Sequence, residues 1–398
     1  MTSNTEIRIA DVCELGDGAH ASIRRSNTGV PYLTSKNIKR GGLNLHQVDY
    51  ISEEDYERHF PPSSKSITRL VEGDVLTGII GTFGNSYVYR ASDRFGISSA
   101  IAVIRPDKSV LSPEYLYHYL NLPYMQSLKE AVASGSVQGY TNLKVVGRLP
   151  LRLPPLKEQQ AIAEILSALD DKIASNTNIS RTADQLAGHL FDQGASSATM
   201  IPMSEVLTPV LGGTPARANL DYWNGESLWA SAKDITGAPF AVVMETEEKI
   251  TQHAVEKTKA KPLPAGSVVL TARGTVGAVA RLAVPSSFNQ SCYGFSPSVL
   301  PPGLLYFSVL RAAQQAKSLA HGSVFDTITM RTFDHLQIPD FGTAGVSTEA
   351  LITPLLDLVS ANILENTLLA KTRDTLLPQL MSGKLHVKDA EALVESVV

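Results

Sequence analysis

The sequence lacks the residues and patterns from which disulfide-rich, membrane-spanning and metal-binding proteins are built. Its two cysteines, Cys13 and Cys292, form no CxxC pair and no disulfide framework, which fits a reducing cytoplasm. No apolar run approaches the ~20 residues of a membrane span. The first residues show no basic region followed by an apolar stretch, so we expect neither a secretory signal nor a membrane segment. The nine histidines show no metal-ligand spacing.

Motifs for catalysis are absent as well. The sequence contains no GxxxxGK followed by Ser or Thr for nucleoside triphosphates, no GxSxG nucleophile turn and no HExxH zinc helix. The neighbouring carboxylates of Asp170 and Asp171 point to different faces of a predicted helix, and we expect both to lie in solvent. The sequence therefore predicts no catalytic residue, no metal and no cofactor in this chain.

The composition is that of a globular protein with two or three domains. Of the 398 residues, 43% are hydrophobic and 19% are charged. The formal net charge of −4 argues weakly against a nucleic-acid-binding protein, because such proteins usually carry a cationic surface. The acidic residues lie in separate runs, however, so the total can conceal a positive groove.

Two long amphipathic segments organise the chain. The first covers residues 157 to about 193, or ~55 Å of helix at ~1.5 Å per residue. Its apolar or small residues alternate in steps of four and three, at Ile162, Leu166, Leu169, Ile173, Asn176, Ser180, Ala183, Ala187 and Leu190. The second shows the same alternation, at Ile352, Leu355, Val359, Asn362, Asn366, Leu369, Arg373, Leu376 and Leu380. We expect it to begin at Thr348 and Glu349, as N-cap and first-turn acid, and to end at Pro378 and Gly383.

This alternation is typical of helices that pack side by side along a seam. One stripe alone would equally fit an ordinary core helix, but two matching stripes favour a pair within the chain. We expect the pair to be antiparallel, because the chain returns to it through a whole domain. For Asn176 and Asn362, both on the seam, two alternatives remain open: a buried amide that costs stability but fixes the register, or a side chain at the wet edge.

The regions before and between the two helices resemble two copies of one domain. Matching motifs recur in the same order, in residues 12–18 and 206–212, 31–38 and 228–235, and 81–84 and 274–277. Short apolar runs between glycine turns predict strands, mixed with short helices. The predicted fold class is α+β: two tandem mixed α/β domains separated by two long helices that form an antiparallel coiled coil, with pseudo-twofold symmetry within one chain. We expect domain boundaries at residues 1–153, 154–195, 196–345 and 346–398.

Cations with polar and aromatic neighbours gather in the predicted loops of both copies. Arginine and lysine with Asn and Tyr in turns provide the chemistry for phosphate contact and for reading base edges. For each residue the alternative is an ordinary solvated surface. The candidates for DNA contact are Arg24, Arg25, Lys36, Lys39, Arg40, Arg69, Asn85 and Tyr87 in the first copy, and Arg217, Lys233, Arg273 and Arg331 in the second.

Two motifs resemble a known family. They are the run Leu153-Pro-Pro-Leu-Lys-Glu-Gln-Gln-Ala-Ile-Ala-Glu-Ile-Leu166 and the later run Leu376-Leu-Pro-Gln-Leu-Met-Ser-Gly-Lys-Leu385. Together with the duplicated domains, they are similar to the specificity subunits of type I restriction–modification systems, and the resemblance covers essentially the whole chain. In one respect the sequence departs from the family: its second helix begins Gly345-Val-Ser-Thr-Glu-Ala-Leu351 and not Pro-Pro-Leu-Lys-Glu-Gln, which leaves docking at that end open.

The resemblance implies a function and a set of partners. Each globular domain would be a target recognition domain that reads one half of a split site in double-stranded DNA. The helix pair would set the spacer between the half-sites and dock methyltransferase subunits, two per chain. S-adenosylmethionine, ATP and magnesium would belong to those partners and to a possible restriction subunit, while this chain would be non-catalytic and cytoplasmic.

Two other functions remain as alternatives. The first is a coiled-coil scaffold with two domains that bind protein or ligand without DNA. The second is a self-sufficient methyltransferase or nuclease, which the missing cofactor motifs disfavour. DNA affinity carried by phosphate contacts falls steeply as salt rises, so salt dependence separates the scaffold from the DNA-binding function.

Overall fold

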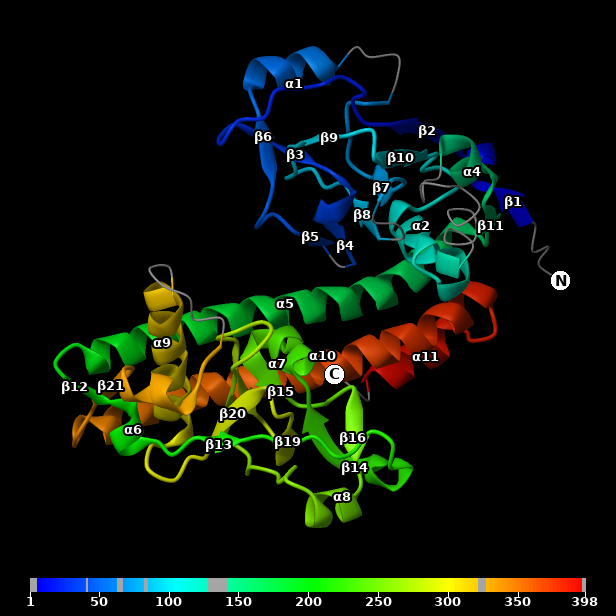
Figure 1. Cartoon of the computed structure of the whole chain (residues 1–398). Helices are drawn as coiled ribbons and strands as arrows, with labels where there is room; N and C mark the ends of the chain where they lie inside the picture. Colours follow the sequence, from blue (N-terminus) through cyan, green and yellow to red (C-terminus); the bar gives the residue numbers. More distant parts are fainter. Residues whose placement is uncertain are drawn as a thin grey trace. The chain divides into compact units, whose positions relative to one another are not determined.

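The computed structural model describes residues 6–40, 42–62, 67–81, 85–127, 142–320 and 327–395. The chain divides into two compact units. The first unit combines Met1–Ala174 with Thr367–Val398, and the second is the continuous stretch Ser175–Asn366. Each unit contains a mixed α/β domain and one part of each long helix (Figure 1). Among the described residues, no helix combines the length and apolar character that crossing a membrane requires.

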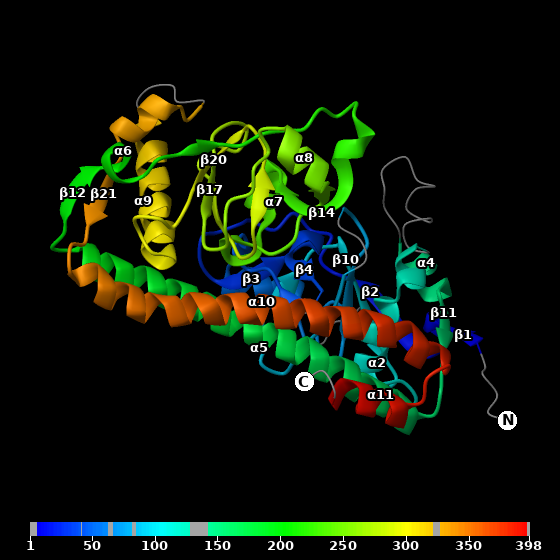
Figure 2. The ribbon, with the colours of Figure 1, turned by 90° about the horizontal axis from the view of Figure 1, so that it is seen from below.

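The two long helices are α5 (Leu156–Ala195) and α10 (Ala344–Ser382). They lie side by side (Figures 1 and 2). In the first unit, Asp170 of α5 pairs with Arg373 of α10. In the second unit, Asn176 bonds to Asn366, and Gly194 lies against Thr348. Later residues of α5 thus meet earlier residues of α10, which confirms the predicted antiparallel pair.

The predicted bounds of α5 are confirmed to within two residues, but those of α10 are partly wrong. A tight turn at Gly342, with φ of +48°, leads from the preceding strand directly into the helix, which therefore begins at Ala344. Thr348 lies inside the helix and donates its hydroxyl to the Ala344 carbonyl. Pro378 also lies inside, because the buried leucines beside it hold the last turns in place despite one missing backbone bond. Gly383, with φ of +72°, ends the helix as expected.

The seam positions predicted from the sequence are buried or half-buried. The buried positions are Ile162, Leu166, Leu169, Asn176, Ser180, Ala183, Ala187, Ile352, Val359, Asn362, Leu369, Arg373, Leu376 and Leu380. The half-buried positions are Ile173, Leu190, Leu355 and Asn366.

Asn176 and Asn362 are 2% and 7% exposed, so the buried alternative holds for both. The side-chain amide of Asn176 donates to Glu365 Oε2 at 2.9 Å and to Asn366 Oδ1 at 3.0 Å. The Asn362 amide donates to the Asn176 carbonyl at 3.3 Å and to Ser180 Oγ at 3.2 Å. Every one of these bonds crosses between the helices, so a shifted register would leave buried amides unpaired.

The domain of the first unit contains two main sheets. A four-stranded antiparallel sheet has the order β2 (Cys13–Asp17), β10 (Ile101–Pro106), β7 (Val75–Gly78), β8 (Ser86–Val88). A three-stranded sheet has the order β6 (Asp49–Ile51), β3 (Val30–Leu33), β9 (Gly96–Ile97), with β3 and β9 parallel. The smaller pairs are β1 (Glu6–Arg8) with β11 (Pro150–Arg152) and β4 (Ile38–Lys39) with β5 (Gly42–Leu43). Its helices are α1 (Glu53–His59), α2 (Pro113–Leu120) and α4 (Leu143–Arg148), and α11 (Val387–Glu395) follows α10.

The domain of the second unit repeats this topology. One sheet has the order β13 (Val210–Leu211), β20 (Cys292–Phe295), β17 (Val268–Thr271), β18 (Val279–Leu282), β15 (Val242–Val243). The other has the order β16 (Glu248–Ile250), β14 (Trp223–Ala230), β19 (Ser286–Phe288), again with one parallel pair, β14 and β19. A further pair joins β12 (Thr199–Pro202) to β21 (Gln337–Asp340). The helices are α6 (Met203–Val206), α7 (Ala232–Gly237), α8 (Gln252–Lys257) and α9 (Pro302–Ala320).

This repetition confirms the duplication expected from the motifs. The tight turn predicted at residues 274–277 is present, with positive φ at Gly274 and Gly277. Its counterpart at residues 81–84 lies largely outside the described residues, which include only Gly81.

In each unit, one polar side chain near the start of a long helix bonds to backbone amides of the domain. Gln159 of α5 is fully buried, accepts a hydrogen bond from the Ser112 amide at 2.9 Å and donates to the Val110 carbonyl at 2.8 Å. In the second unit, Glu349 of α10 accepts from the Gly303 and Leu304 amides at 2.9 and 2.8 Å. A carboxylate there satisfies amides that the first turn of α9 leaves unpaired. Glu349, expected to start α10, therefore caps α9 and takes the place that Gln159 has in the first unit.

Candidate nucleic-acid interface

In the first unit, two of the predicted cations lie where three segments of the domain meet. The Ser35 hydroxyl donates to the Ile80 carbonyl at 2.6 Å, and the side-chain amide of Asn85 donates to the Ile38 carbonyl at 3.3 Å. These bonds hold the segment from residue 34 to 39 beside Ile80, which follows β7, and beside Asn85, which precedes β8. Lys36 and Lys39 are exposed on that segment and form no ion pair within the described part of the chain. Arg24 is likewise exposed and forms no described ion pair.

In the second unit, a hydrogen bond between two backbone groups brings two predicted cations to neighbouring segments. The Ile328 amide donates to the Ala272 carbonyl at 3.0 Å. It places the short helix Met330–Asp334 beside the turn after β17. Arg273 and Arg331 are exposed on these two segments, and neither forms an ion pair with any residue that the structure describes. Both units therefore present cations without an ion-pair partner among the described residues, on loops that hydrogen bonds hold together.

Several other predicted residues are already engaged by their own unit. The Arg69 guanidinium donates to the Phe60 carbonyl at 2.7 Å and lies over the Tyr56 ring. Arg40 pairs with Asp374 of α10 at 2.7 Å, and Lys233 pairs with Glu247 at 2.6 Å. Asn85 supports the loop backbone, as described above. These side chains anchor segments of the fold, whereas Lys36, Lys39, Arg273 and Arg331 leave their charge available to a ligand.

Arg25 and Arg217 form a third group. Each guanidinium lies over an aromatic ring and pairs with an exposed carboxylate of the same unit.

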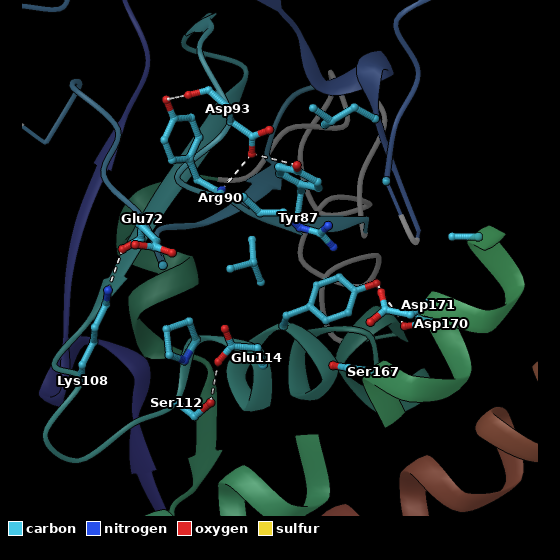
Figure 3. A pocket seen from close by; sticks show the side chains of 18 of the residues that line it. Glu72, Tyr87, Arg90, Asp93, Lys108, Ser112, Glu114, Ser167, Asp170 and Asp171 are labelled. Atoms are coloured by element: carbon cyan, nitrogen blue, oxygen red, sulfur yellow. Dashed lines mark hydrogen bonds between the residues drawn. The ribbon is translucent and has the colours of Figure 1, made fainter. Parts of the chain in front are cut away.

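The first unit also contains an open pocket of about 790 Å³, shown in Figure 3. Its carboxylates are Glu72, Asp93, Glu114, Asp170 and Asp171, against only Arg90 and Lys108 as cations. An excess of carboxylates repels phosphate, so this pocket is not a DNA-binding surface.

Tyr87, predicted as a DNA contact, lines this acidic pocket. Its hydroxyl donates to Asp93 Oδ2 at 2.8 Å, and burial together with this bond raises the pKa of Tyr87. Figure 3 shows Tyr87 and Asp93 turned toward one another. The geometry therefore favours a structural role for Tyr87 over contact with DNA.

The sequence-based expectation for Asp170 is wrong. Its side chain is only 11% exposed and pairs with Arg373, which is a seam residue of α10. Beside it, His118 of α2 is buried, with Nε2 3.0 Å from Ser167 Oγ. The sequence feature that indicates a buried carboxylate is Arg373, because an arginine on a buried seam requires a carboxylate partner. Within the described ranges, no group of three or more His, Cys, Asp or Glu could hold a metal ion.

Comparison with known proteins gives consistent results. Residues 2–184 and 201–339 match the family model of the type I restriction modification DNA specificity domain. The type I restriction enzyme HindI specificity subunit of Haemophilus influenzae is 22% identical over 407 residues, covering 79% of this chain and 87% of that protein. The MjaIX specificity subunit of Methanocaldococcus jannaschii is 28% identical over 131 residues, covering 32% of this chain and 30% of that protein.

A solved structure supports the fold. The type I restriction-modification S subunit from M. genitalium superposes with a TM-score of 0.62 at 15% identity, covering 94% of this chain and 95% of the other. The family model covers most of the sequence in two copies, one in each half, and favours the DNA-binding function over the scaffold. This chain belongs to the family of type I restriction–modification DNA specificity proteins and carries two of its domains in tandem.

Proposed function

We propose that this chain selects the DNA target of a type I restriction–modification complex, with one half of a split target contacted by each domain. The observation that carries the proposal is the repeated domain topology, in which both copies expose cations that pair with no carboxylate of the described ranges. Cations of this kind bind phosphates and base edges. The helix pair sets the unread spacer between the two half-sites.

Catalysis belongs to the partners in this proposal. A methyltransferase subunit supplies S-adenosylmethionine, and a restriction subunit, where present, supplies ATP hydrolysis with magnesium. The duplication of the chain supports two methyltransferase subunits per chain. Because its substrate is cellular DNA, the complex works in the cytoplasm.

The helix pair of the second unit offers a surface for such a partner. Ile179 and Leu186 of α5 lie seven residues apart, as do Leu351 and Leu358 of α10, and all four are 40–58% exposed. On the opposite flank of the seam, Phe191 and Leu356 pack into the core of the domain. We call the four exposed residues the outer stripe. Apolar residues at heptad spacing on an exposed helix pair are what a further helix requires for packing.

Charging the outer stripe should separate partner docking from folding. We expect Leu186→Asp combined with Leu358→Asp to weaken binding of the methyltransferase subunit more than about tenfold, because both carboxylates would be buried on docking. Thermal unfolding of the isolated chain should change little, since both positions are exposed. Gln185→Asp, exposed on the same turn of α5, is the matched control. Full retention of the partner by the double variant would assign docking to another surface.

Methylation mapping tests the proposed function directly. Cells that express this chain with its methyltransferase are compared with cells that lack the chain, using single-molecule sequencing of their DNA. We expect a split methylated motif that appears only when the chain is present, and the motif gives both half-sites and the spacer. If a stable complex forms and no motif depends on this chain, the proposed function is wrong.

A further inference from the structure

In each unit one arginine, Arg25 or Arg217, lies over an aromatic ring and pairs with a carboxylate. We call this arrangement of arginine, ring and carboxylate a clasp. In the first unit, Cζ of Arg25 lies 3.9 Å from the centre of the Tyr32 ring, and its Nε lies 3.4 Å from Asp49 Oδ2. In the second unit, Cζ of Arg217 lies 3.9 Å from the centre of the Trp223 ring and 5.2 Å from that of Trp229. Its two terminal nitrogens donate to the two carboxylate oxygens of Glu248.

Strand register shows that the two clasps are equivalent. Tyr32 of β3 lies directly opposite Asp49 of β6. Trp229 of β14 lies directly opposite Glu248 of β16. Tyr32 and Trp229 are therefore equivalent rings, each paired with the carboxylate across an antiparallel strand pair, and the arginine comes from the segment that precedes the central strand. Trp223, the nearer ring in the second unit, is a further contact that has no counterpart in this register. The duplicated fold has kept all three chemical groups.

The ion pair of each clasp is accessible to solvent. The arginine side chains are 39% and 57% exposed, and the carboxylates are 50% and 40% exposed. An exposed ion pair contributes little stability, because water and salt screen it. The ring, by contrast, holds the planar guanidinium in one orientation, whichever anion the arginine binds. The carboxylate is thus the exchangeable partner and the ring is the fixed one.

We propose that Arg25 and Arg217 are matched DNA contacts, one in each recognition domain, and that Asp49 and Glu248 compete with DNA for them. This inference rests on the proposed function and adds a mechanism to it. A phosphate, or the acceptor edge of a guanine, accepts the same two-pronged donation that Glu248 accepts. On binding, the nucleic acid replaces the carboxylate while the ring holds the guanidinium in position. In the free chain, the carboxylate neutralises the arginine and so limits attachment to non-target DNA.

Neutralising the arginine of a clasp and neutralising its carboxylate should therefore change the affinity for DNA in opposite directions. The assay uses the complex with its methyltransferase, duplexes carrying the mapped target, and a series of salt concentrations. We expect Arg217→Gln to weaken binding about tenfold and to reduce the salt slope by about one. We expect Glu248→Gln to tighten binding about two- to fivefold at low salt, because the competing carboxylate is gone. Asp49→Asn and Arg25→Gln should repeat this pattern in the first domain.

Controls separate this mechanism from a purely structural clasp. Glu245→Gln removes an equal charge from a nearby residue whose partner is Lys249, and it should affect binding less than Glu248→Gln. Arg217→Lys keeps the charge but loses the two-pronged contact, so it should bind with intermediate affinity. A structural clasp predicts instead that Glu248→Gln and Arg217→Gln weaken binding together and lower the unfolding temperature together.

The outcomes also separate this inference from the function on which it rests. If the wild-type complex shows no preference for any mapped target, the proposed function fails. If the wild type prefers its target while Arg217→Gln binds equally well, or Glu248→Gln binds more weakly, only the competition mechanism is overturned.

Discussion

Leu169→Asp should unfold the first unit. Leu169 is 1% exposed and belongs to the core that α5 shares with Leu376, Leu380 and the domain of that unit. A carboxylate there loses its hydration, and the nearby Arg373 is already paired with Asp170, so we expect the unit to lose more than about 4 kcal/mol of stability. Urea unfolding of the isolated chain measures the loss, and co-purification should show that the methyltransferase is lost with it.

The control is Ser175→Asp, an equal charge at an exposed position of the same helix. It should leave both the unfolding midpoint and the partner unchanged. If the Leu169→Asp chain were as stable as the wild type and kept its partner, the seam would not be what holds the first unit together.

The stability of the first unit should also depend on pH through His118. Burial, with the nearby charges of Arg373 and Arg40, lowers the pKa of His118 from 6.5 to about 3. The unfolded chain therefore binds a proton at a higher pH than the folded chain. The contribution of His118 to the free energy of unfolding is fully present above the unfolded-state pKa of 6.5 and is lost as the pH falls toward 3. From pH 7 to pH 5 the loss is about 2 kcal/mol for this one group.

The second unit suggests the variant that tests this dependence. Helices α2 and α9 both begin at a proline, Pro113 and Pro302, so His118, the sixth residue of α2, matches Phe307, the sixth of α9. Phe307 packs against Phe191 of α5. His118→Phe removes the titrating group and keeps an aromatic ring in the same place. We expect the variant to lose about 2 kcal/mol less than the wild type between pH 7 and pH 5, as measured by urea unfolding at each pH. Equal losses in both chains would show that His118 does not set the acid sensitivity.

Periodicity is the reason that so much of the fold could be predicted. Leu166, Leu169, Val359 and Leu376 repeat at heptad spacing, and that spacing is a local property of the sequence. The start of α10 was misplaced because Thr348 and Glu349 match a helix start, while the real start depends on the turn at Gly342. Local patterns specify that a helix exists, and contacts with the rest of the fold decide where it begins.

The candidate interface could be predicted only in part. The sequence shows that Arg69 and Lys233 are cationic, but their partners Glu57, Phe60 and Glu247 become neighbours only through folding. The pair between Asp170 and Arg373 joins residues 203 positions apart, so the seam pattern shows that Arg373 needs a carboxylate but not which residue supplies it. Composition identifies the charge of a side chain, whereas the fold decides whether that charge is already neutralised.

The division of the chain also has a consequence for its synthesis. The second unit is one continuous stretch, Ser175–Asn366, and can close as soon as that stretch has left the ribosome. The first unit begins earlier but lacks Leu369, Leu376, Leu377, Leu380 and Met381 of its core until the second unit and the end of α10 have also been made. Its unfinished apolar surface is a natural target for chaperones throughout that interval. An mRNA truncated after the codon for Asn366 would yield a chain whose second unit folds while the core of its first unit stays incomplete.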